Sequence, residues 1–112
     1  MDSLDQYRDI IEAALIEQTR VPFSDPEIEL EPIFDRKHDR YLLMLVGWKK
    51  DEDRVHGCLV HLDIINGKIW IQRDGTEDGI ATALEAAGVP KDHIVLAFRP
   101  LELRKYSEYA VV

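Results

Sequence analysis

Cysteine is nearly absent from this sequence, because Cys58 is the only one. A single cysteine cannot form a disulfide within the chain, so nothing in the fold requires an oxidising compartment. Long apolar runs are absent too, since no stretch reaches the roughly 18 residues of a membrane-spanning helix. The start, Met1-Asp-Ser-Leu-Asp5, has neither the basic residues nor the apolar stretch of a signal peptide. We therefore expect a cytoplasmic protein that does not enter a membrane.

Positive charge is also scarce. The chain has 14 Lys and Arg against 22 Asp and Glu, a formal net charge of −8. Affinity for nucleic acid comes chiefly from basic side chains that neutralise phosphates. The basic residues near Arg36 and Arg104 are interspersed with acidic ones, which is typical of a solvated surface. We do not expect the isolated chain to bind DNA directly.

What is present is the composition of a folded domain. Of the 112 residues, 46% are hydrophobic and 32% are charged, a balance that excludes a disordered tail. A chain of this length buries about 65% of the surface that its unfolded form exposes. We expect one domain over residues 1–112.

Helices are expected at two places. Apolar residues recur at helical spacing from Leu4 to Leu15, which predicts an amphipathic helix over 4–18 with Asp2 or Ser3 as N-cap. This helix should end near Thr19, because the Val21-Pro-Phe-Ser-Asp-Pro26 segment cannot continue it. A second helix is predicted over 77–87. Its start is attributed to Thr76 as N-cap, and its end to Gly88 and Pro90.

The strands follow from alternation and from turn residues. Residues 28–34 alternate with glutamates and contain Pro32, which predicts an edge strand, whereas 41–48 is apolar on both faces and should be central. Residues 54–65 predict a third strand, in which Gly57 marks a bulge or a close approach. Three later elements are expected: a buried strand at 94–98, a turn of helix within 101–107, and a final edge strand at 109–112.

Together these elements predict an α+β fold, a mostly antiparallel sheet of five to six strands with the two helices packed against it. Both helices fit on one face of the sheet. The second face of the 41–48 strand would then need burial, and a homodimer or a partner protein would provide it.

The Asn66-Gly67 pair between two strand patterns predicts a tight hairpin turn. Pairing Ile65 with Lys68 makes Asp63 face Trp70, His61 face Gln72, and Leu59 face Asp74. One side of the hairpin is then apolar: Val60, Leu62, Ile64, Ile69 and Ile71. The other side carries the candidate partner- or ligand-binding residues: His61, Asp63, Trp70, Gln72 and Asp74. This side is either solvated, or a protein interface anchored by Trp70, or the wall of a ligand pocket.

No complete catalytic or metal-binding set is found beside it. A restriction-type nuclease would need a carboxylate and a lysine where Gln72-Arg73-Asp74 stands. The Asp74-x-Thr76-x-Asp78-Gly79 spacing mimics a calcium loop, but a strand precedes it and a helix cap is the better interpretation.

The histidines and the cysteine are also incomplete as sites. On an unbroken strand His56 and His61 point to opposite faces, so they cannot share a metal. Cys58 shares the face of Val60 and Leu62, so a core thiol is expected. We expect no cofactor, no metal and no enzymatic activity.

Several segments carry a family resemblance. They are Arg54-Val-His-Gly-Cys58, His61-Leu-Asp-Ile64, Gly67-Lys-Ile-Trp-Ile-Gln-Arg-Asp-Gly-Thr-Glu-Asp-Gly-Ile80, and Ala87-Gly-Val-Pro-Lys91 with Ile94-Val-Leu96. The chain resembles the XisI family, the fdxN element excision controlling factors, from Tyr7-Arg8 to Tyr109-Ala-Val111. It departs from the family's expected Phe-x-Pro-Pro-Glu-x-Arg tail, since Phe98-Arg-Pro-Leu-Glu-Leu-Arg104 lacks one proline.

The resemblance implies a cyanobacterial-type protein that acts with an XisH-like companion and a site-specific recombinase in excising a DNA element during heterocyst differentiation. It implies no catalytic residues. A different function stays open, namely a small metal- or ligand-dependent enzyme, or the regulatory subunit of a nuclease, that uses His61, Asp63 and Asp74.

Overall fold

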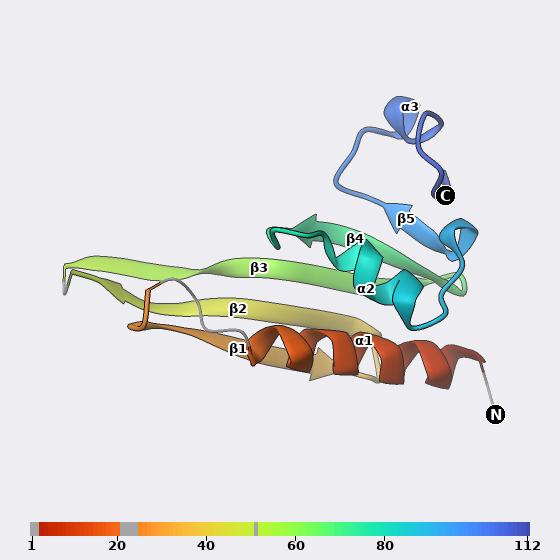
Figure 1. The fold of residues 1–112 in the computed structure, drawn as a ribbon. Coiled ribbons are helices and arrows are strands. Elements are labelled where there is room, and N and C mark those ends of the chain that lie inside the picture. The colour runs from red at the N-terminus through yellow and green to blue at the C-terminus, as the bar shows by residue number, and fades with distance from the viewer. Residues whose placement is uncertain (1–2, 21–24, 51) are drawn as a thin grey trace.

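A meander of four antiparallel strands makes up most of the sheet (Figure 1). The computed structural model describes residues 3–20, 25–50 and 52–112. The strands are β1 (Ile28–Asp35), β2 (Arg40–Lys49), β3 (Asp53–Ile65), β4 (Lys68–Asp74) and β5 (Ile94–Leu96), and they lie in this order across the sheet. Among these five described strands, β5 alone is parallel to its neighbour, β4. The expected α+β fold with a mostly antiparallel sheet is confirmed.

The helices are α1 (Ser3–Thr19), α2 (Ile80–Ala86) and the short α3 (Leu101–Arg104), with a 3-10 turn at Lys91–His93. The helix predicted over 4–18 is therefore confirmed, whereas its expected N-caps, Asp2 and the Ser3 side chain, lie outside the described residues. The expected final strand is reduced to a single bridge that joins Ala110 to Val95. The expected turn of helix near the C-terminus is present as α3.

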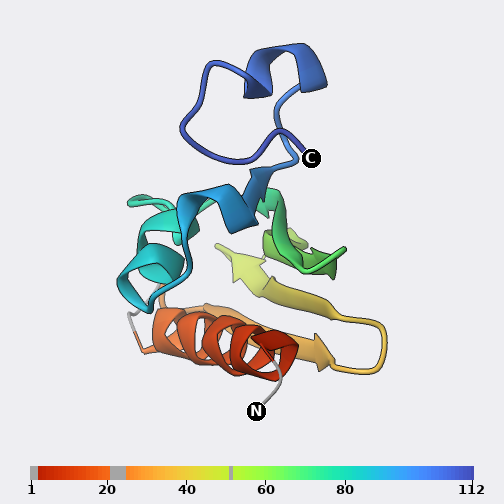
Figure 2. The ribbon, with the colours of Figure 1, turned by 90° about the vertical axis from the view of Figure 1, so that its right-hand side faces the viewer.

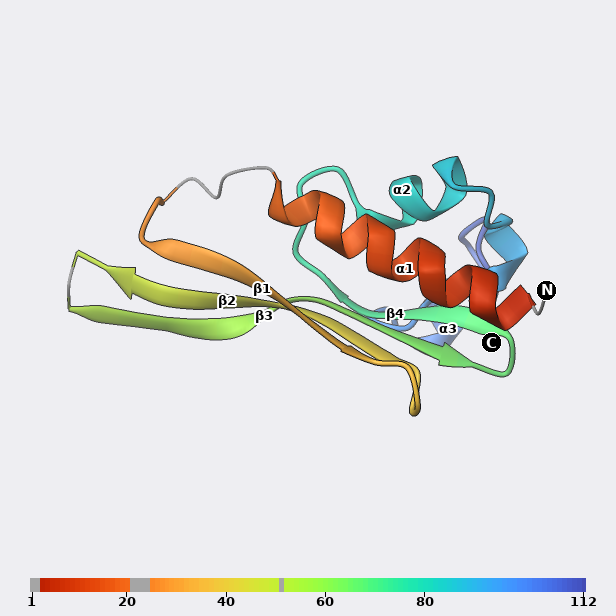
Figure 3. The same ribbon diagram turned by 90° about the horizontal axis from the view of Figure 1, so that it is seen from below.

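Both long helices cover the same face of the sheet, as Figure 3 shows from below. Ile11 and Leu15 of α1 join Leu84 of α2 in one buried cluster with the side chains that point from the sheet toward them. These sheet residues are Tyr41, Leu43, Val60, Leu62, Ile64, Ile69, Ile71, Ile94 and Leu96. The opposite side, which we call the open face, has neither long helix on it.

Two irregularities change which side chains reach the open face. The pairing of β2 with β3 passes from Leu43–Val60 to Met44–Cys58 and so skips Leu59. The pairing of β3 with β4 skips Gln72 in the same way. An extra residue in one strand reverses the alternation of all residues beyond it. The bulge predicted at Gly57 is therefore wrong by two positions.

The sheet extends beyond its helices in two directions. Along the strands the β2–β3 hairpin reaches past α1 (Figure 1), and beyond the β5 edge the chain continues into α3 (Figure 2). The molecule measures 43 × 34 × 24 Å along its principal axes. Among the described residues, no helix combines the length and the hydropathy of a membrane-spanning segment.

Candidate functional site

The β3–β4 hairpin has the predicted turn and the predicted register next to it. Asn66 and Gly67 have φ values of 52° and 77°, the left-handed conformations that a type I′ turn requires. Ile65 pairs with Lys68 and Asp63 pairs with Trp70, as expected. Further from the turn the prediction is wrong.

The skipped Gln72 shifts the outer half of this hairpin. His61 faces Arg73 instead of Gln72, and Asp74 faces Val60 instead of Leu59. Val60 lies on the helix side of the sheet, so Asp74 leaves the predicted polar face. The other four candidate residues stay on the open face or reach it.

Asp74 forms hydrogen bonds to the backbone at the start of α2. Its Oδ2 accepts a hydrogen bond of 2.7 Å from the backbone N–H of Ile80, and its Oδ1 accepts one of 2.9 Å from the N–H of Thr76. The Asp74 carboxylate thus satisfies the N–H of Ile80, the first residue of α2, while the N-cap position itself is Gly79 and not Thr76. The helix therefore starts at Ile80, and the start predicted at residue 77 is wrong. Because the Asp74 carboxylate accepts these backbone hydrogen bonds, it does not act as the first ligand of a calcium loop.

Asp63 is the centre of a small polar cluster on the open face. The residue is buried, with 4% of its surface exposed. His61 Nε2 donates to its Oδ1 at 2.8 Å, Gln72 Nε2 donates to its Oδ2 at 3.3 Å, and Arg40 lies 3.6 Å from that second oxygen. A buried carboxylate needs polar or charged partners, and His61, Gln72 and Arg40 supply them to both oxygens of Asp63.

A carboxylate that orients a histidine is also the base arrangement of many hydrolases. In the described part of the chain, however, no hydroxyl or thiol is hydrogen-bonded to the His61 ring. The same part of the chain contains no group of three His, Cys, Asp or Glu side chains placed to hold a metal ion. His61 and Asp63 therefore form a pair without the remaining members of a catalytic set.

Cys58 and His56 change faces because of the skipped Leu59. Cys58 pairs with Met44 and His56 pairs with Val46, so both lie on the open face with His61. The prediction that Cys58 shares the face of Val60 is wrong, as is the opposition of the two histidines. Burial raises the pKa of the Cys58 thiol, and its Sγ donates to the Val60 carbonyl at 3.2 Å. The nearby charge of Arg73 acts in the opposite direction but does not outweigh burial, so the thiol is favoured over the reactive thiolate.

Trp70 is held by the chain's own C-terminal segment. Its ring lies 5.6 Å from the guanidinium of Arg104, which also donates to the carbonyls of Ala97 and Val111. Its Nε1 is buried, and among the described residues no acceptor is bonded to it. The indole is thus a partly buried packing element rather than a fully exposed anchor.

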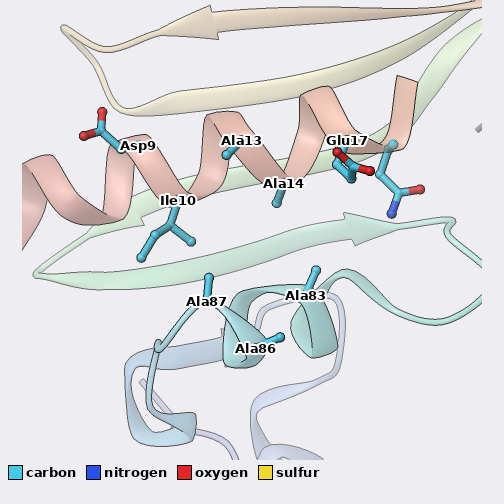
Figure 4. Close-up of a pocket in the computed structure, with 9 residues that line it drawn as sticks. Asp9, Ile10, Ala13, Ala14, Glu17, Ala83, Ala86 and Ala87 are labelled. Carbon is cyan, nitrogen blue, oxygen red and sulfur yellow. The ribbon is translucent and has the colours of Figure 1, made fainter. Parts of the chain in front are cut away.

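A groove between α1 and α2 is a second candidate surface (Figure 4). Its volume is about 530 Å³, and its walls are mainly the small side chains of Ala13, Ala14, Ala83, Ala86 and Ala87. The carboxylates of Asp9 and Glu17 also line it, and Arg36 binds Asp9 at 3.2 Å. The described residues of the groove provide an apolar surface bordered by carboxylates, which suits binding, and they contain no nucleophile paired with a base.

The fold and these surfaces define a small α+β protein with one face of its sheet covered by helices and the other open. The chain belongs to the XisI protein family, whose model matches residues 1–111. A XisI-like protein from Anabaena variabilis ATCC 29413 has a similar crystal structure, with a TM-score of 0.88 and 33% identity over 97% of this chain and 99% of that one.

A second crystal structure, of the fdxN element excision controlling factor XisI from Anabaena variabilis ATCC 29413, is also similar. Its TM-score is 0.84 and its identity 32%, over 99% of this chain and 100% of that one. No curated protein matches the chain.

Proposed function

We propose that this protein is a controlling factor for the excision of a DNA element, which acts through protein partners and performs no bond chemistry itself. The observation that carries the proposal is its similarity, over 99% of its length, to a protein named for that role. The partners in this proposal are an XisH-like companion and a site-specific recombinase. Because excision takes place where the DNA is, the protein would act in the cytoplasm.

The charge of the chain supports an indirect action on DNA. With a net charge of −8, the protein would be repelled by the phosphate backbone unless a partner supplied the basic surface. The incomplete sets around Asp63 and Cys58 support a role without catalysis.

For the companion we propose the exposed side of the β3–β4 hairpin, where His61, Gln72 and Arg73 surround the Asp63 cluster. Arg73 is exposed there and donates to the backbone carbonyl of Cys58 at 2.7 Å. Polar groups that are already held in place lose little conformational freedom on binding, which favours recognition.

The first experiment reconstitutes excision from the companion, the recombinase and DNA that carries the element, with and without this protein. We expect excision to depend on the protein, and the protein alone to leave the DNA intact. Metal-dependent cleavage by the isolated chain that is lost in Asp63→Ala would contradict the proposal and establish the enzymatic alternative.

A second experiment locates the companion. Arg73→Glu should weaken co-purification by roughly tenfold, because it reverses a charge on the contact surface. Arg20→Glu makes the same change at the end of α1 and should have no effect. Loss of binding in Ala86→Glu, with Arg73→Glu unaffected, would move the companion to the groove between α1 and α2.

A further inference from the structure

The open face of β1, β2 and β3 carries three parallel rows of different chemistry, which we call the three-row face. Its acidic row on β1 is Glu29 and Glu31, its apolar row on β2 is Leu42, Met44, Val46 and Trp48, and its basic row on β3 is Arg54 and His56. Cross-strand pairing places Glu29, Val46 and His56 at one level, with the apolar residue in the middle. Alternation along each strand directs these side chains away from the helices.

Helices α1 and α2 lie on the other face of the sheet, and of the apolar row Trp48 is exposed whereas Leu42, Met44 and Val46 are partly buried. Trp48 is 46% exposed, and Ile33, which pairs with Leu42 at the end of the acidic row, is 50% exposed. The guanidinium of Arg54 lies 5.2 Å from the Trp48 ring centre, so a cation already borders the apolar row. A contiguous apolar strip with charged margins is typical of a protein interface.

The chain exposes enough surface for a second protein layer to pack on the open face of the sheet. A monomer of 12.9 kDa ordinarily exposes about 6,300 Å², whereas this chain exposes 7079 Å². Such an excess is expected of an elongated chain with extents of 43 × 34 × 24 Å, and at roughly 800 Å² it is of the same order as the area that each partner contributes to an interface of standard size. The radius of gyration, 14.7 Å, also exceeds the roughly 13 Å of a compact chain of this length.

We propose that two copies of this chain form a homodimer by packing their three-row faces together, with the two-fold axis running along β2. In this arrangement the apolar row of one copy lies on the apolar row of the other. The acidic row of each copy lies opposite the basic row of its partner, so that Glu29 faces His56 of the partner subunit and Arg54 lies one pair further along the strand.

The charges select this axis over the alternative. A two-fold axis perpendicular to the strands would instead place the acidic row of one protomer on the acidic row of its partner, and the basic row on the basic row. Like charges would then meet along both margins of the interface. Two molecules of net charge −8 repel each other at long range, so a stable dimer needs local attraction of this kind. Face-to-face sheets lie about 10 Å apart, a gap that Glu and Arg side chains on the margins can span.

The test begins with the molar mass of the purified chain at micromolar concentration, measured by light scattering. We expect about twice 12.9 kDa for the wild type. Met44→Glu places an uncompensated charge in the middle of the apolar row and should raise the dissociation constant by on the order of 100-fold or more. Ile16→Glu adds the same charge at an exposed apolar residue of α1 and should leave the dimer intact. Circular dichroism confirms that both variants are folded.

Charge reversal then tests the axis. Glu29→Arg and His56→Glu should each weaken self-association, because the first puts a second guanidinium beside Arg54 of the partner subunit and the second puts a carboxylate opposite Glu29 of the partner subunit. When the two variant chains are mixed, every reversed residue meets its complement, so a heterodimer of the two should form with near wild-type affinity. The chain that carries both substitutions should dimerise again by itself.

A monomeric wild type at 100 µM would overturn the proposal and leave the three-row face to another partner. A dimer that resists Met44→Glu, or variants that do not rescue each other on mixing, would also overturn it. The proposal does not rest on the excision role, since self-association is measured on the isolated chain, so either one can fail without the other.

Discussion

Asp74 Oδ2 accepts a hydrogen bond of 2.7 Å from the backbone N–H of Ile80, and this contact joins the end of β4 to the start of α2. Asp74 is not itself the N-cap residue, which is Gly79, but it satisfies a first-turn N–H as an N-cap side chain does, and loss of such a contact typically costs about 1–2 kcal/mol. Asp74→Ala should therefore lower the free energy of unfolding by about 1–2 kcal/mol in urea titrations. Asp78→Ala removes a neighbouring exposed carboxylate and serves as the control. If both variants lose the same stability, the contact of Asp74 with Ile80 does not stabilise the helix.

A second prediction concerns two glycines on neighbouring strands, Gly47 on β2 and Gly57 on β3. A Cβ atom at Gly47 would lie 2.2 Å from the Glu27 carbonyl oxygen and 2.8 Å from the Cα of Ile28, whereas one at Gly57 would meet nothing within 4 Å. The backbone of β1 would have to move, so Gly47→Ala should destabilise the protein by about 3 kcal/mol, the upper end of the cost of overpacking. Gly57→Ala should be neutral or slightly stabilising, because alanine reduces the freedom of the unfolded chain.

Thermal unfolding of both variants is the measurement. Equal midpoints would contradict the close contact between β1 and β2 at Gly47. The close approach that glycine indicates in a strand does occur, but at Gly47 rather than at Gly57, where it was predicted.

A third prediction follows from Arg8, which joins α1 to the β1–β2 turn through Asp39. Arg8 Nε donates to Asp39 Oδ1 at 2.7 Å, and a second guanidinium nitrogen donates to Oδ2 at 3.1 Å. The hydrogen bond from Arg8 holds the pKa of Asp39 below its usual range, with a further contribution from the Tyr41 hydroxyl. The ionised form is therefore favoured in the folded state.

A carboxylate with a lowered pKa stabilises the fold above the pKa of the unfolded chain, about 3.9, and loses this effect as the pH falls through the folded-state value. Asp39→Asn should thus lower the free energy of unfolding by about 1–2 kcal/mol at pH 7, and the difference from wild type should shrink below about pH 4. Asparagine also tolerates the φ of 55° at this position, so the turn is kept. A difference that is constant from pH 3 to pH 7 would exclude the ionic contribution.

The parts of the fold that could be predicted are those that depend on neighbouring residues. The Asn66-Gly67 turn, the end of α1 near Thr19 and the edge position of Pro32 each follow from backbone restrictions within a few residues. The candidate face was predicted from one assumption, an unbroken alternation outward from the turn. This holds for Asp63 and Trp70, which are nearest to it.

The parts that could not be predicted depend on contacts between distant segments. Whether a strand skips Leu59 or Gln72 depends on the pairing of whole strands, and one skipped residue moves Cys58 and Asp74 to the opposite face. The cover that Arg104 provides over Trp70 comes from a segment more than 30 positions away. The apolar second face of β2 and the alternating glutamates of β1 were visible in the sequence, but which residues of β3 lie beside them on the open face depends on the register of the three strands.

The last prediction uses Cys58, because its environment reports on both the protomer and the proposed dimer. Burial raises the pKa of the thiol, so less thiolate is present at pH 7 than for a free cysteine, and the thiolate is the species that reacts. Alkylation by iodoacetamide at pH 7 should be slower than for the unfolded chain. Cys58 also pairs with Met44 on the open face, so a second copy packed there would shield it further. Alkylation should therefore slow as the protein concentration rises in the wild type, and this dependence should vanish in Met44→Glu while Ile16→Glu keeps it. A rate that does not change with concentration, in a protein whose mass is that of a dimer, would place the contact between the two copies on another face.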